Sequence, residues 1–285
     1  MDARKSEDAG VSHRSTANPE GAPSQDATPP QTESPQAQPP ADARREAPPS
    51  EAVLTVLNPA GVTRGVALVL HGGRSHSFEP VQARHLSPAR MVPFARHLHR
   101  AGSKHGLAVW ILRNSVRGWN GEDMSPLKDA RWAMAKIRDQ HPGVPVYLLG
   151  HSMGGLTAIC AADEEQVDAV VALAPWLNDA TPATPVAGRK VLIVHGDRDR
   201  WTSPTASLRF ARRAAPDAEV LRYVSLRRAG HFMFRRVRLW HTLATGFLMT
   251  AFIEKTGTHA GRLPAPAAAL ERLLPPSAQA IPEVL

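Results

Sequence analysis

A serine surrounded by small residues is the strongest chemical signal in the sequence, at Gly-His-Ser-Met-Gly-Gly over residues 150–155. It follows an apolar run at 146–149 and precedes a helix-like run at 156–163. A sharp turn from strand to helix would expose the Ser152 hydroxyl in a strained backbone conformation, and glycines on either side avoid collisions across such a turn. A glycine-rich phosphate-binding turn is the alternative, but its patterns need another spacing and usually a lysine. We therefore predict that Ser152 is a nucleophile.

A histidine must take the proton of such a serine, because a neutral hydroxyl is a weak nucleophile. His231 follows the last strand-like run, at 220–225, and precedes an amphipathic helical pattern, so it is expected in a loop at the end of a strand. Among the 13 histidines, His71 and His195 stand in His-Gly pairs at strand ends, and His241 falls inside a helical pattern. His231 is the predicted base.

An acidic residue that orients the imidazole is expected between the serine and the histidine in chain order. Asp197 and Asp199 both follow the strand-like run at 191–194. Asp199 is favoured because it lies farther into the loop, just before the helix start at Ser203, whereas Asp197 is the better candidate for shaping the turn. Asp179, after the preceding strand, is a third candidate.

Acyl transfer also needs donors for the developing oxyanion. The tripeptide His-Gly-Gly follows the apolar run at 66–70, and we predict the backbone N–H groups of Gly73 and Met153 as the two donors. Taken alone, the tripeptide is equally typical of a simple turn.

Trp176 directly follows a strand, on the side where such sheets bind ligands, and is the predicted pocket residue, with core packing as its alternative. Two further tryptophans fall on candidate loops: Trp119 and Trp201.

Short apolar runs alternate with helical patterns from about residue 52 onward, which is typical of an α/β fold with a parallel sheet covered by helices. Several runs are continuously apolar, as expected of strands buried on both faces. The candidate strands are residues 53–57, 66–70, 107–112, 146–149, 169–173, 191–194 and 220–225. The candidate helices are residues 125–140, 204–214, a long amphipathic pattern over 237–251, and a short one at 267–274.

The serine hexapeptide, the His-Gly-Gly tripeptide, the His-Gly-Asp-x-Asp loop at 195–199 and the Ala-Gly-His loop together resemble the α/β-hydrolase superfamily, over about residues 52–255. They look most like its esterase, monoglyceride-lipase and serine-aminopeptidase-like branch. The resemblance implies a mostly parallel central sheet, and it implies these site residues: Ser152, Asp199 and His231 as a triad, with Gly73 and Met153 as oxyanion donors. Only about sixteen residues separate 173 from 190, where many relatives insert a helical lid, so we expect no separate lid domain and an open site.

Residues 1–50 differ from the rest, because they hold 9 of the 26 prolines and only Met1 and Val11 among large apolar side chains. Such a segment buries too little apolar surface to offset the entropy of ordering it, so disorder is predicted. Its start resembles neither a secretory signal nor a transit peptide, which favours the cytoplasm. We expect a catalytic domain over 51–256 and a Pro/Ala-rich tail over 257–285.

The formal net charge of +8 is uneven: residues 1–50 have a balance of −3 and the remainder +11. No basic motif with interleaved aromatic residues is present, so nucleic acid is not an expected partner, and a solvated basic surface is favoured. A separate hypothesis, an anionic group on the substrate, comes from a local cluster near His231: Arg227, Arg228, Arg235, Arg236 and Arg238. The longest apolar run, 239–253, is too short to cross a bilayer.

The single cysteine, Cys160, excludes an internal disulfide and is expected to be a buried filler.

The predicted function is hydrolysis of a small carboxylic ester through an acyl-serine intermediate, with no cofactor and no metal. Amide or peptide hydrolysis and acyl transfer use the same triad and stay open, as does the oligomeric state. A non-catalytic ligand-binding protein on the same fold is a further alternative, and so is an interaction protein that works through residues 1–50. The joint presence of all the expected site positions favours an enzyme.

Overall fold

The computed structural model of the protein describes residues 51–257, 264–274 and 283–285. The disorder predicted for residues 1–50 lies outside the described residues, as does part of the tail expected at 257–285. The strands are β1 (Val53–Leu57), β2 (Gly65–Leu70), β3 (Leu107–Arg113), β4 (Val146–His151), β5 (Val167–Leu173), β6 (Lys190–Gly196), β7 (Val220–Leu226) and β8 (Glu283–Val284). The helices are α1 (Leu86–Gly102), α2 (Ser125–Gln140), α3 (Met153–Cys160), α4 (Pro204–Ala214), α5 (Val237–Thr256) and α6 (Ala265–Leu273).

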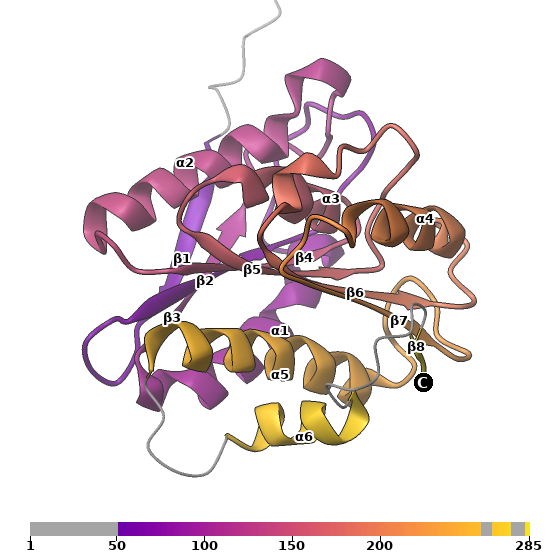
Figure 1. The fold of residues 1–285 in the computed structure, drawn as a ribbon. Coiled ribbons are helices and arrows are strands. Elements are labelled where there is room, and N and C mark those ends of the chain that lie inside the picture. The colour runs from indigo at the N-terminus through magenta and orange to yellow at the C-terminus, as the bar shows by residue number, and fades with distance from the viewer. Residues whose placement is uncertain (1–50, 258–263, 275–282) are drawn as a thin grey trace, which may run out of the picture. The chain divides into compact units, whose positions relative to one another are not determined.

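The strands form a single sheet in the order β1-β3-β2-β4-β5-β6-β7-β8 (Figure 1). Strand β1 runs antiparallel to β3, and the other neighbouring pairs are parallel. Every residue of β2 and of β5 is buried, as expected of continuously apolar strands that are covered on both faces. The predicted mostly parallel sheet is confirmed, and the carboxyl ends of its central strands meet at one edge, where such sheets bind ligands.

Helices cover both faces of the sheet. Figure 1 shows α2, α3 and α4 on one side and α1, α5 and α6 on the other. On the first side, Ile137 and Phe210 are buried in one apolar cluster. On the second side, Phe94 and Trp240 are buried in another. The two clusters pack against opposite faces of the sheet, and this packing positions the loops that follow the strands at the sheet edge.

Two elements depart from the sequence pattern. Helix α1 is not predicted, because Pro93 lies inside it and an interior proline normally breaks a helix. It forms because Met91, Phe94 and Leu98 are buried on one face against the sheet. Strand β8 is not predicted either, since two residues in a Pro/Ala-rich segment are too few to show the hydrophobic alternation of a strand. It forms by pairing with β7.

Two central strands run farther than their apolar runs suggest. Strand β4 continues to His151 and β6 to Gly196, each two residues beyond the predicted end. Helix α3 begins at Met153, as expected for a sharp turn directly after the serine. Strand β4 and helix α3 are therefore separated by Ser152 alone.

The connection between β5 and β6, residues 174–189, contains only one short 3-10 turn, Thr184–Val186. No lid domain is inserted there, as predicted. Within the described ranges, none of the helices is both long enough and apolar enough to span a membrane.

Candidate active site

Ser152 occupies the turn between β4 and α3 with φ 57° and ψ −119°. Residues other than glycine rarely adopt a positive φ, so the backbone is strained here. The turn is held from β5: the N–H of Ser152 donates to the carbonyl oxygen of Leu173, and its own carbonyl accepts from the N–H of Trp176, both at 3.0 Å. The strained serine expected from the sequence is therefore present.

Glycines make this turn sterically possible. A Cβ atom on Gly150 would lie 2.0 Å from the carbonyl oxygen of Gly154. A Cβ atom on Gly154 would lie 2.5 Å from the carbonyl oxygen of Leu70 at the end of β2. Both neighbours are backbone atoms and cannot move aside, so the two positions require glycine.

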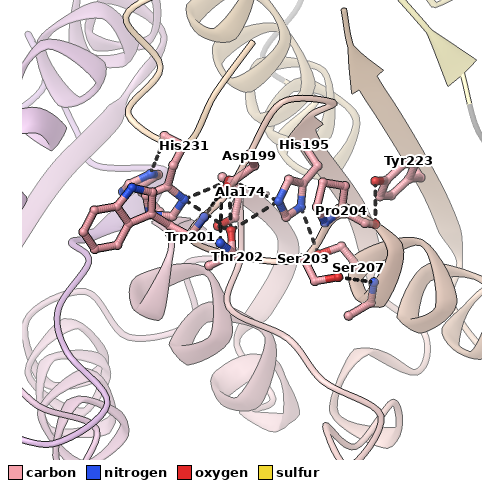
Figure 2. Close-up of polar contacts among 12 residues, drawn as sticks. Ala174, His195, Asp199, Trp201, Thr202, Ser203, Pro204, Ser207, Tyr223 and His231 are labelled. Carbon is pink, nitrogen blue, oxygen red and sulfur yellow. Dashed lines mark hydrogen bonds and ion pairs between the residues drawn. The ribbon is translucent and has the colours of Figure 1, made fainter. Parts of the chain in front are cut away.

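His231, between β7 and α5, lies against Asp199, in the loop after β6. Nδ1 of His231 is 2.8 Å from Oδ2 of Asp199 (Figure 2). The side chain of Asp199 is fully buried and that of His231 is 6% exposed. Asp197 is exposed, and Asp179 pairs with Arg209 instead. Of the three carboxylates considered, the one that contacts His231 is Asp199.

Hydrogen-bond donors around Asp199 favour the ionised form of its carboxyl group. Its Oδ1 accepts the backbone N–H groups of Trp201, at 2.8 Å, and Thr202, at 2.9 Å, while Oδ2 accepts the Thr202 hydroxyl at 2.9 Å. Burial opposes ionisation, but hydrogen bonds from His195, His231 and these backbone N–H groups outweigh it and hold the pKa of Asp199 well below its usual range. A carboxylate that stays charged can orient and stabilise a protonated imidazole.

His195, at the end of β6, is a second imidazole on Asp199, on the side away from His231 (Figure 2). Its Nε2 is 3.2 Å from Oδ2 of Asp199, and its Nδ1 is 3.0 Å from the hydroxyl oxygen of Ser207. Burial lowers the pKa of His195, so we assign a neutral ring that donates from Nε2 to Asp199 and accepts from Ser207 at Nδ1.

Sequence reasoning missed this role of His195. The signal was the spacing of four residues to Asp199, which has this meaning only if the loop folds back onto the strand end. The bonds that shape this loop are made by Asp199, whereas Asp197, the residue expected to make them, is exposed.

Ser152 and His231 open onto the same cavity, of about 980 Å³. Nε2 of His151 is 2.9 Å from the backbone carbonyl oxygen of His231, so the residue beside the serine anchors the histidine loop. Burial lowers the pKa of His151 to about 3, which keeps that ring neutral. The Ser152 hydroxyl makes no hydrogen bond to His231 within the described part of the chain. Such contacts are often long before substrate binds.

The two predicted oxyanion donors both line this cavity. Met153 is the first residue of α3, where a backbone N–H has no partner within the helix. A Cβ atom on Gly73 would lie 2.3 Å from both the carbonyl oxygen of Arg117 and Cε of Met153, so the two donor residues are in close contact. Among backbone acceptors in the described ranges, neither N–H has a partner.

Two of the three tryptophans named from the sequence line the cavity, and one of these, Trp176, also packs against the apolar cluster on the α2 side of the sheet. Trp176 lines the cavity, as expected, and so does Trp201, which is 72% exposed and has its ring 6.3 Å from that of His231. Trp119 packs against the apolar cluster on the α2 side of the sheet. Cys160 is partly buried, and burial raises the pKa of its thiol to about 11.

The arginine cluster near His231 in sequence does not reach the cavity. None of its members is part of the wall: Arg227, Arg228, Arg235, Arg236 and Arg238. The cavity lining therefore gives no support to the hypothesis that these residues bind an anionic substrate group. Four other arginines line it instead: Arg74, Arg84, Arg90 and Arg117. No group of three His, Cys, Asp or Glu residues in the described chain is arranged to hold a metal ion.

Comparison with known proteins gives a partial family match. The model of the serine aminopeptidase family S33 matches residues 113–190, which include Ser152. Human monoglyceride lipase is 31% identical over 108 residues, which cover 37% of this chain and 32% of the lipase. The chain thus spans about a third of the length of the curated relative that it matches.

Solved structures extend the likeness over most of the described chain. An α/β serine hydrolase homologue from Coxiella burnetii has a TM-score of 0.53 at 16% identity, covering 68% of this chain and 90% of that one. An α/β serine hydrolase from Xanthomonas campestris, described as being without a lid, has a TM-score of 0.50 at 18% identity, covering 69% and 88%. At these identities the likeness shows the fold.

A mostly parallel sheet with a strained serine between β4 and α3 defines an α/β-hydrolase fold, which the solved structures share. The family model that matches part of this chain, residues 113–190, is the serine aminopeptidase one.

Proposed function

We propose that this protein is a serine hydrolase that cleaves a small carboxylic ester through an acyl-serine intermediate. The observation that carries the proposal is the buried pair of Asp199 and His231, which faces the cavity onto which the strained Ser152 also opens. A binding protein would have no need of an ionised buried carboxylate behind a histidine.

In this mechanism, Nε2 of His231 accepts the hydroxyl proton while Oγ of Ser152 attacks the ester carbonyl carbon. The N–H groups of Gly73 and Met153 donate to the oxyanion that forms. His231 then gives its proton to the departing alkoxide, which leaves as the alcohol. A water molecule loses a proton to His231 and attacks the acyl carbon, the bond from that carbon to Oγ of Ser152 breaks, and His231 returns the proton to Oγ, so that the carboxylic acid and the free Ser152 hydroxyl result. Asp199 stabilises the charged imidazole in each half of the cycle.

The open β5–β6 connection supports a short acyl group, because no lid is inserted there to bury a long chain. Hydrolysis of p-nitrophenyl butyrate and p-nitrophenyl dodecanoate by the wild type and by Ser152→Ala tests the proposal. We expect turnover of the butyrate to exceed that of the dodecanoate, and a loss of roughly 10³-fold or more in the variant. Equal turnover by the two proteins would remove Ser152 as the nucleophile, and faster cleavage of the dodecanoate would contradict the size preference.

Amide hydrolysis is the second candidate, and the match to the serine aminopeptidase model is the observation in its favour. An aminoacyl p-nitroanilide assayed beside the ester separates the two. Higher kcat/KM on the anilide than on p-nitrophenyl butyrate would favour the peptidase.

A further inference from the structure

The active-site cavity is strongly basic. Among the residues that the structure describes, its wall holds four arginines and no aspartate or glutamate. Arg117 is neutralised by an ion pair with Glu79, and Arg74 and Arg84 are exposed side chains that water can solvate. Arg90 is different, because it is half-buried and has no ion-pair partner in the described part of the chain.

Arg90 projects from α1 and lies beside the candidate catalytic histidine. Its guanidinium carbon is 4.7 Å from the ring centre of Phe232, the residue after His231, and 5.5 Å from that of Phe234. Its Nε is buried and makes no hydrogen bond among the described residues. A buried donor without a partner costs free energy, and a cation that has lost part of its water costs more. A bound anion would compensate the guanidinium for the water that it has lost.

The charge of Arg90 also acts on the residue beside the serine. His151 precedes Ser152, and after burial and the charge of His231, the charge of Arg90 contributes to lowering the pKa of His151. Arg90, Phe232 and Ser152 all line the one cavity. A ligand in that cavity can therefore place its carbonyl group at Ser152 and an anionic group at the guanidinium of Arg90.

We propose that the substrate carries a carboxylate in addition to its scissile ester, and that Arg90 binds this carboxylate while Ser152 attacks the ester carbonyl. This inference rests on the proposed hydrolase function. A planar guanidinium suits a carboxylate because two parallel N–H groups can donate to its two oxygens. The face of Phe232 holds the guanidinium in place through a cation–π contact.

Two matched ester pairs test the proposal and identify which part of the substrate carries the charge. meta-Acetoxybenzoate and meta-acetoxybenzamide differ in charge on the alcohol side, and monoethyl adipate and its terminal amide differ on the acyl side. We expect the wild type to prefer the anionic member of one pair. Arg90→Met, which keeps a long apolar stem against Phe232, should lower kcat/KM for that anion by ~10 to 100-fold and for its amide by less than about threefold.

Arg96→Met is the matched control. Arg96 lies on the same helix but lines a different cavity, so the variant removes the same charge without touching the site. It should leave both members of each pair within about twofold, since a distant exposed charge is screened. Arg90→Lys keeps the charge and loses the fork, and it should recover only part of the anion preference. Equal losses on anion and amide in Arg90→Met would mean that Arg90 only packs against Phe232.

A binding experiment separates this inference from the hydrolase proposal. Calorimetry with Ser152→Ala should show tighter binding of meta-hydroxybenzoate or adipate than of the matching amide, and adding Arg90→Met should abolish the difference. Ester turnover with no charge preference in either pair would overturn the carboxylate inference and leave the hydrolase standing. Anion binding that depends on Arg90, without turnover of any ester, would do the reverse.

Discussion

Replacing Asp199 by asparagine tests the role of the hydrogen-bond donors that surround this carboxylate. If the amide oxygen keeps the two backbone N–H bonds of Oδ1, the amide NH₂ faces Nδ1 of His231 at 2.8 Å and Nε2 of His195 at 3.2 Å. Both rings must then shift their proton to the other nitrogen, which places a hydrogen on Nε2 of His231, the atom that must accept the serine proton.

The flipped amide is no better, since its NH₂ would then meet two backbone N–H donors and forfeit both hydrogen bonds, at a cost of about 1–3 kcal/mol for each buried group left unsatisfied. In either orientation the charge that stabilises the imidazolium is gone. We expect Asp199→Asn to lower kcat/KM by roughly 10³ to 10⁴-fold, which corresponds to about 4–5.5 kcal/mol in the barrier.

The assay is steady-state hydrolysis of p-nitrophenyl butyrate, with a thermal melt to show that the variant is folded. Asp197→Asn is the matched control, because it makes the same change two residues earlier at an exposed side chain. It should stay within about twofold of the wild type, as surface substitutions usually do. A folded Asp199→Asn protein that retains more than a tenth of wild-type activity would refute the reasoning.

Three further predictions follow from the described residues. Gly150→Ala places a Cβ atom 2.0 Å from a carbonyl oxygen and should lower the melting temperature sharply, whereas Gly61→Ala, with open space around it, should change it little; similar melts for the two would show that the turn can relax. Burial lowers the pKa of His71 to about 4 and that of His151 to about 3, from an ordinary 6.5. At these two histidines the unfolded chain takes up protons below pH 6.5 while the folded one does not, so together they should lower the free energy of unfolding by up to about 2.7 kcal/mol for each pH unit of acidification between pH 6 and 4.5. Urea titrations in that range measure it, and a flat profile would contradict the burial. Deleting residues 1–50 should leave ester turnover intact, because every site residue lies beyond them; loss of all turnover would point to a mechanism that needs this segment.

The local geometry of the site could be predicted from the sequence because its determinants are local. The helix from Ser125 to Gln140 and the turn at Ser152 are both specified by residues within a few positions of each other. The same holds for the strands, whose continuous apolar runs reflect burial on both faces.

The site residues that could not be predicted from the sequence are positioned by the tertiary fold. Arg90 was missed because α1 contains an interior proline and forms through its packing on the sheet. His195 was missed because its contact with Asp199 exists only where the loop after β6 folds back onto the strand end, and its other partner, Ser207, belongs to the following helix. The arginines after residue 226 were misjudged for the opposite reason, since closeness to His231 in sequence does not bring them to the cavity.

The proposed hydrolase mechanism requires that Oγ of Ser152 is the atom that is acylated. Reacting the full chain with a fluorophosphonate and mapping the adduct by peptide mass spectrometry tests this directly. We expect one phosphonylated peptide, modified at Ser152, and no adduct in Ser152→Ala. An adduct on another residue, or equal labelling of the two proteins, would contradict it.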